Sequence, residues 1–84
     1  MLEASIYIVL KETVSDPQGL TIKHALNSLN YKEVEDVRFG KFILVKLNLK
    51  NKKLAQKRID EMCKELLANQ IIEEYSFKIS EATT

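Results

Sequence analysis

The sequence is poor in the residues that cross-link, kink or anchor a chain. Its 84 residues include one cysteine, one proline, two glycines and no tryptophan. The single cysteine, Cys63, excludes an intrachain disulfide and a cysteine-cluster metal site. No run of about 20 apolar residues is present, which argues against a transmembrane helix. The N-terminus lacks the basic and then apolar segments of a signal peptide. We therefore expect a cytoplasmic protein.

Neither sign of charge is in excess. Thirteen Lys and Arg residues against twelve Asp and Glu residues leave a net charge of +1. This balance gives no global electrostatic reason to bind nucleic acid or an anionic membrane. Hydrophobic residues make up 45% and charged residues 30%, which is typical of a globular domain. We expect one domain over residues 1–84, with a frayed polar tail at about 81–84.

Apolar residues recur with the periods of strands and helices. The unbroken β-rich run Ile6–Leu10 predicts a strand. Asp16 followed by Pro17 predicts a helix start, because Asp is a good N-cap and proline has its φ already set. Gly40 and Lys41 suit a two-residue type II′ turn between two strands. The predicted strands span 4–10, 34–39, 42–49 and about 71–79, and the predicted helices begin at Pro17 and after Asn51.

This β-α-β-β-α-β order predicts an α+β fold of ferredoxin-like order, with a four-stranded antiparallel sheet and two helices on one face. The predicted strands 4–10 and 42–49 are apolar on both parities, however, whereas a sheet with one wet face should alternate apolar and polar residues. A large exposed apolar patch is unusual on a monomer. We therefore expect a homodimer through the other sheet face, formed by one parity of the strands Ile6–Leu10 and Phe42–Leu47. A partly wet second face is the alternative.

No residue pattern predicts a catalytic, cofactor-binding or metal site. His24 is the only histidine. A catalytic role would need a nucleophile and an orienting carboxylate beside it, and a lone histidine on a helix flank is more often a surface or packing residue. Cys63 falls on the apolar stripe of the second predicted helix, where it acts as a small hydrophobe. An RNA-recognition motif would need a stacking aromatic where Leu44 stands. From the residues alone we predict a non-catalytic oligomerising module.

Three segments carry motifs that are specific in combination. They are Val14–Gly19, which contains Asp-Pro-Gln-Gly; Val34–Lys41, which contains Val-Arg-Phe-Gly-Lys; and Leu66–Asn69 followed by Tyr75. In this order and spacing they resemble the PurS family, the small subunit of phosphoribosylformylglycinamidine (FGAM) synthase, over nearly the whole chain. The chain departs from the frequent family residues at Glu12, Thr13, Asn30 and Gln70.

The resemblance implies a non-catalytic scaffold in de novo purine biosynthesis. Such a subunit joins a PurQ-type glutaminase to a small PurL-type synthetase and assists ammonia transfer between them. The complex would use ATP, Mg²⁺ and glutamine, while this chain would bind no cofactor itself. The resemblance also implies a homodimer, or a tetramer.

The motif residues are the candidates for partner contact under this resemblance. They are Asp16, Pro17, Gln18, Gly19, Arg38, Gly40 and Lys41. Pro17 and Gly40 are equally well explained by the helix start and the turn.

Two other classes share this order of elements. A regulatory ligand-binding domain of the ACT type would also dimerise through its sheet. A small enzyme of the acylphosphatase type would need an arginine in the loop after the first strand, and Lys11–Gly19 contains none.

Overall fold

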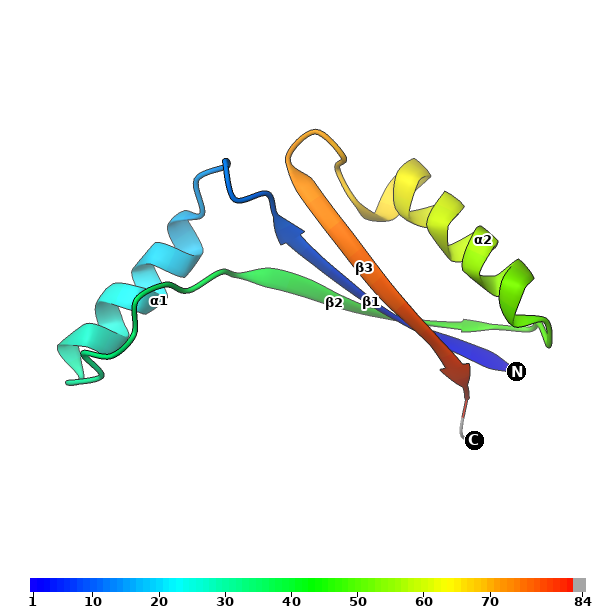
Figure 1. Ribbon diagram of the computed structural model, residues 1–84, viewed down its shortest axis with the longest axis horizontal. Helices are drawn as coiled ribbons and strands as arrows, with labels where there is room; N and C mark the ends of the chain where they lie inside the picture. The colour runs from blue at the N-terminus through cyan, green and yellow to red at the C-terminus, as the bar shows by residue number, and fades with distance from the viewer. Residues whose placement is uncertain (83–84) are drawn as a thin grey trace.

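The structure is a computed structural model that describes residues 1–82 (Figure 1). It has a β-α-β-α-β order within an α+β fold. The elements are β1 (Leu2–Leu10), α1 (Pro17–Ser28), β2 (Gly40–Leu47), α2 (Lys52–Met62), the π-helical turn η1 (Cys63–Leu67) and β3 (Glu73–Glu81). Asn51 caps α2 as predicted, because its side-chain oxygen accepts hydrogen bonds from the N–H groups of Lys53 and Leu54.

The strands form one antiparallel sheet in the order β2-β1-β3. The register places Ile6 opposite Ile43 on β2 and opposite Phe77 on β3. Alternation along β1 buries its even-numbered residues from Leu2 to Ile8. We call the side that carries these buried residues the inner face and the opposite side the outer face.

One helix covers the inner face. Ala55, Ile59 and Cys63, from α2 and η1, are fully buried together with Ile6 and Ile8. This cluster is the hydrophobic core, and half-buried side chains of β2 and β3 pack around it. The predicted burial of Cys63 is confirmed.

The other helix stands away from the sheet. Figure 1 shows α1 as a separate limb beyond the end of β1, with α2 on the sheet at the opposite end. Gly19 is the only buried residue of α1. The radius of gyration is 16.2 Å, whereas a compact domain of this length has about 12 Å. The expectation that both helices pack on one face of the chain's own sheet is therefore wrong.

The predicted hairpin at Gly40 and Lys41 is also wrong. Residues 31–39 form no strand, and the chain runs from them into β2 without reversing, so the sheet has three strands instead of four. Gly40 does not have the positive φ of a type II′ turn. It lies opposite Val9 within the sheet, and a Cβ placed on it would be 2.5 Å from the carbonyl oxygen of Ile8. Glycine is needed there for a close approach of two backbones.

The ends of two elements complete the fold. Asn30 has a φ of 75° just after α1, the left-handed conformation that asparagine adopts more readily than most residues at the end of a helix. Ser80 and Glu81 belong to β3, and the N–H of Ala82 donates to the carbonyl of Met1 at 3.0 Å. The expected frayed tail thus begins in the sheet, and its residues 83–84 lie outside the described part of the chain.

Candidate interaction surfaces

The Asp16 carboxylate joins α1 to the segment that leads into β2. Its Oδ1 accepts a hydrogen bond from the N–H of Gly19 at 2.9 Å, and its Oδ2 accepts one from the N–H of Phe39 at 2.7 Å. The side chain is 3% exposed. The Phe39 hydrogen bond, followed by that from Gly19, lowers the pKa of Asp16 from its ordinary value. Asp16 is therefore an N-cap that also fixes a residue 23 positions away.

Arg38 binds the same segments together from the other side. Its Nη2 donates to the carbonyl oxygens of Leu10 and Lys11 at 2.9 Å each, and its Nε lies 4.0 Å from Asp16 Oδ2. A Cβ on Gly19 would be 2.3 Å from the carbonyl oxygen of Val37, so α1 can approach this segment only because residue 19 is glycine. The end of β1, the start of α1 and the start of β2 are thus tied together. We call this set (Asp16, Gly19, Arg38 and Phe39) the joint.

The remaining motif residues lie beside the joint. Lys41 Nζ is 3.3 Å from Glu73 Oε2, and the N–H of Asn69 donates to Glu73 Oε1 at 2.7 Å. The Asn69 hydrogen bond is the larger cause that lowers the pKa of Glu73. Gln18, Gly40 and Lys41 share the lining of a shallow depression of about 180 Å³ with Glu73, whereas Pro17 is exposed at the start of α1.

The structure thus brings the two motifs together at one place. They are far apart in the sequence, and no residue pattern in it indicates their contact. Asp16 and Arg38 are engaged within the chain, while Gln18 and Lys41 remain exposed. The depressions at this place are smaller than the roughly 300–1,000 Å³ of typical ligand pockets.

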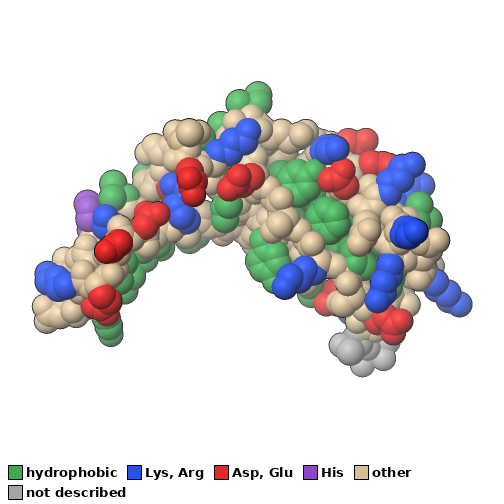
Figure 2. All heavy atoms as spheres, viewed as in Figure 1, with side chains coloured by type: hydrophobic (Ala, Val, Ile, Leu, Met, Phe, Trp, Pro, Cys, Tyr) green, Lys and Arg blue, Asp and Glu red, His purple; other side chains and the backbone are tan. Residues whose placement is uncertain are grey.

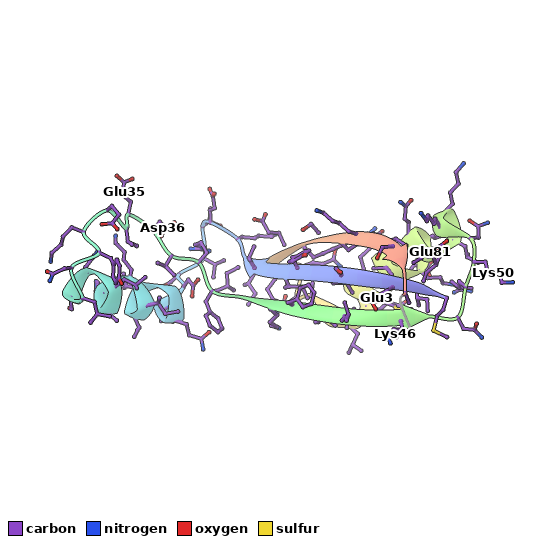
Figure 3. All side chains as sticks on the ribbon, turned by 90° about the horizontal axis from the view of Figure 1, so that it is seen from below. Glu3, Glu35, Asp36, Lys46, Lys50 and Glu81 are labelled. Atoms are coloured by element: carbon purple, nitrogen blue, oxygen red, sulfur yellow. The ribbon has the colours of Figure 1, made fainter. Side chains whose placement is uncertain are left out.

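The outer face of the sheet carries an exposed apolar cluster. Tyr7, Phe42 and Leu44 are 45%, 57% and 51% exposed. The ring centroids of Tyr7 and Phe42 are 5.1 Å apart, and the ring planes are inclined at 59° to each other. Aromatic pairs prefer tilted arrangements of this kind to a face-to-face stack. We call these three residues the outer-face patch. Toward the chain ends the same face turns polar, with Glu3 opposite Lys46 (Figure 3).

The second exposed apolar surface is on α1. Leu20, Ile22 and Leu29 are 52%, 37% and 68% exposed. Ile22, Ala25, Leu26 and Leu29 recur at helical spacing, and we call them the α1 stripe. In Figure 2 hydrophobic side chains line the underside of this limb, where the molecule is hollowed between the limb and the sheet. The pattern of this helix was evident in the sequence, but its exposure was not.

Reactive groups are not clustered in the described part of the chain. Residues 1–82 contain no group of three His, Cys, Asp or Glu side chains that could hold a metal ion. His24 is exposed on α1. Burial, with a smaller contribution from Asp60, raises the pKa of the Cys63 thiol, which keeps it in the unreactive thiol form. Within the same range no helix is long and apolar enough to cross a membrane.

Known proteins of similar sequence and structure identify the family. A family model described as "PurS: Phosphoribosylformylglycinamidine (FGAM) synthase" matches residues 3–81. The PurS subunit of Bacillus subtilis is 42% identical over 81 residues, which are 96% of this chain and 95% of that protein. The crystal structure of Methanocaldococcus jannaschii PurS superposes with a TM-score of 0.88 at 36% identity, covering 99% of this chain and 100% of the other. A chain in the structure of PurLQS from Thermotoga maritima superposes at 0.84 with 30% identity, covering 95% and 99%.

A small α+β chain with two exposed apolar surfaces has the features of an interaction subunit. The comparisons make that class specific. The chain belongs to the PurS family and is a subunit of FGAM synthase, a glutamine-dependent ligase of purine biosynthesis. These findings favour the PurS-like subunit over the ACT-type and acylphosphatase-type alternatives.

Proposed function

We propose that this chain is the scaffold of its synthase, and that it holds a PurQ-type glutaminase and a small PurL-type synthetase together so that ammonia passes between them. The observation that carries the proposal is the presence of two exposed apolar surfaces, the outer-face patch and the α1 stripe. The PurLQS complex of Thermotoga maritima contains a chain similar to this one. ATP, Mg²⁺ and glutamine would be used by the partners, in the cytoplasm.

The physical contribution of such a scaffold is geometric. Ammonia released into water is protonated at neutral pH and diffuses away from the synthetase. Holding the two active sites in one assembly raises the effective concentration of ammonia at the second site without any acid or base from the scaffold. The scaffold must therefore be rigid where it meets its partners. The joint supplies this rigidity, because it fixes α1 relative to the sheet through charge-assisted hydrogen bonds.

The scaffold acts as a homodimer in this proposal. The accessible surface of the chain is 6428 Å², whereas a compact monomer of this mass exposes about 5,100 Å². The excess of about 1,300 Å² exceeds the roughly 800 Å² that each partner buries in a standard interface. A second copy is the partner that is always available to cover this surface, and a two-fold axis would cover it equally on both chains. The outer-face patch remains a predicted contact, between copies or between dimers in a tetramer.

The exposed motif residues are the proposed contacts with the other subunits. Gln18 and Lys41 lie on the surface beside the joint, and Asp16 and Arg38 hold that surface in shape from beneath. The backbone of this surface depends on Pro17, which begins α1, and on Gly19 and Gly40, which allow close backbone approaches.

Assembly can be measured directly. Purified glutaminase and synthetase are passed over a size-exclusion column with light scattering, with and without this chain. We expect one ternary particle only when the chain is present. Gln18→Ala combined with Lys41→Ala should weaken the particle, whereas the matched control Gln56→Ala with Lys57→Ala on the exposed side of α2 should not. A ternary particle that forms equally well without the chain would contradict the proposal.

A further inference from the structure

We propose that the free edge of β3 is a second contact between copies of this chain, separate from the apolar surfaces of the proposed homodimer. Two copies pair their β3 strands antiparallel about a two-fold axis at Ser76, so that two homodimers join through one continuous sheet. The contact rests on the proposed homodimer only for the number of chains in the particle. Three features of β3 support it: an unprotected edge, the direction of the free backbone groups and two charges without a partner in the chain.

The first feature is the lack of protection along the outer edge of β3. This strand pairs with β1 along one edge, and no described residue pairs with its other edge. Edge strands are commonly protected by shortness, proline, a bulge or an inward-pointing charge. β3 is nine residues long, contains no proline and keeps an unbroken register with β1 from Glu73 to Glu81. Between these ends its inward side chains are Tyr75, Phe77 and Ile79, none of them charged. The edge is therefore a template for another strand.

The second feature is the direction of the backbone groups. The N–H of Ala82, which follows β3, donates to the carbonyl oxygen of Met1 at 3.0 Å, so even-numbered positions of this strand direct their groups toward β1. Because these directions alternate along an antiparallel strand, Tyr75 and Phe77 direct their N–H and C=O groups toward the free edge. A two-fold axis at Ser76 sets Tyr75 of one copy opposite Phe77 of the other. The free groups of these residues then meet in hydrogen-bonded pairs.

The third feature is a pair of exposed charges on β3, Glu74 and Lys78. Their neighbours across β1 are Val9 and Ser5, and neither charge forms an ion pair within residues 1–82. They lie about 13 Å apart along the strand, too far to pair with each other. An axis at Ser76 places Glu74 opposite Lys78 of the other copy, twice by symmetry. An axis at either charged residue would instead oppose like charges, so the charges favour Ser76.

The same register suits the inner face of the sheet. Within one chain the ring centroids of Tyr75 and Phe77 are 6.5 Å apart, with the ring planes 10° from parallel. The two-fold axis sets each ring opposite the other type on the second copy, which brings four rings together on the inner face. Cross-strand aromatic pairs and opposite-charge pairs both stabilise an antiparallel sheet. Both faces of β3 are thus complementary to themselves in one register.

An engineered disulfide tests the axis. In this register Ser76 forms a non-hydrogen-bonded pair with Ser76 of the other copy, at a Cα separation of about 4.5 Å, which a disulfide can bridge. We expect Ser76→Cys to give a covalent dimer on a non-reducing gel after mild oxidation. The control Lys78→Cys is exposed on the same face, but its two copies would lie about 13 Å apart. It should give at least about fivefold less covalent dimer. The native Cys63 is buried and does not contribute.

Charge reversals test the register independently. E74K and K78E each oppose like charges at two symmetric places, so each should raise the dissociation constant of the contact by about 2- to 30-fold in sedimentation equilibrium. The combination of E74K with K78E restores opposite charges and should recover most of the loss. The matched control E65K changes an exposed residue of η1 and should leave the constant unchanged.

The outcomes separate the β3 contact from the proposed homodimer. We expect a wild-type particle of four chains at high protein concentration, together with the Ser76→Cys disulfide. A wild-type particle of two chains whose variant forms no more disulfide than Lys78→Cys would overturn the β3 contact and leave the homodimer intact. A disulfide in a particle of only two chains would make β3 the homodimer interface itself and overturn a second contact. A wild-type monomer would overturn both. A combination of E74K and K78E no tighter than the single variants, as expected for an edge that binds another subunit, would contradict the pairing of two copies.

Discussion

Leu29 at the tip of α1 offers the clearest test of whether a second copy covers the α1 stripe. Its side chain is 68% exposed in the single chain. Complete burial of a leucine contributes about 1.5–3 kcal/mol, so covering the exposed two-thirds contributes about 1–2 kcal/mol per copy. A two-fold dimer buries it twice, which gives about 2–4 kcal/mol. Since about 1.4 kcal/mol corresponds to a factor of ten, Leu29→Ala should raise the dimer Kd by roughly 30- to 700-fold.

Sedimentation equilibrium over a wide range of protein concentration measures this Kd. Leu66→Ala is the matched control, because Leu66 is 83% exposed on η1, away from α1 (Figure 1). We expect Leu66→Ala to leave the Kd within twofold of the wild type. Both variants should keep the wild-type free energy of unfolding for the protomer, since neither side chain is in the core. Equal Kd values for Leu29→Ala and the wild type would refute the argument that α1 is covered in the dimer.

Three further predictions concern the core and the titrating groups. Ile59→Ala removes a fully buried side chain, and it should lower the free energy of unfolding by about 2–5 kcal/mol in denaturant titration; a loss under 1 kcal/mol would contradict the core. The lowered pKa of Asp16 means that its stabilisation is present above its ordinary pKa and is lost as pH falls through the folded value. Asp16→Asn should therefore destabilise the protein at pH 7, and the deficit should shrink at about pH 2; a deficit that is equal at both pH values would contradict this. The Tyr75 hydroxyl donates to Asp60 Oδ1 at 2.5 Å, and this hydrogen bond raises the pKa of Tyr75 to about 12. The associated stability is complete below the ordinary pKa of 10 and is lost as pH rises toward 12, so one late tyrosine in the ultraviolet titration should disappear in Tyr75→Phe.

Local signals in the sequence predicted the starts of both helices correctly. The caps at Asp16 and Asn51 and the left-handed Asn30 depend on neighbouring residues alone, so sequence reasoning could find them. The alternation of Tyr75, Phe77 and Ile79 with polar residues is equally local, and these three side chains pack against the core on the inner face. These features needed no knowledge of distant contacts.

The errors arose where a residue type serves two purposes. Gly40 suits a tight turn, but the structure needs it for a close backbone approach to Ile8. An apolar helical stripe predicts that α1 packs against a sheet, but it does not show whether that sheet belongs to the same chain. The partner contacts of Asp16 and Arg38 stay a prediction, and the hydrogen bonds that their side chains make within the joint are an additional role that the sequence did not indicate. An aspartate N-cap and an arginine 22 residues later gave no sign of meeting, because the order of elements does not specify how β1, α1 and β2 converge.

The central claim is that this subunit couples two active sites without chemistry of its own. The most direct measurement compares glutamine-dependent and ammonia-dependent synthase rates of cognate glutaminase and synthetase, with and without this chain. The account predicts that the chain restores the glutamine-dependent rate and leaves the ammonia-dependent rate nearly unchanged. A chain that alters neither rate, or that raises both equally, would contradict it.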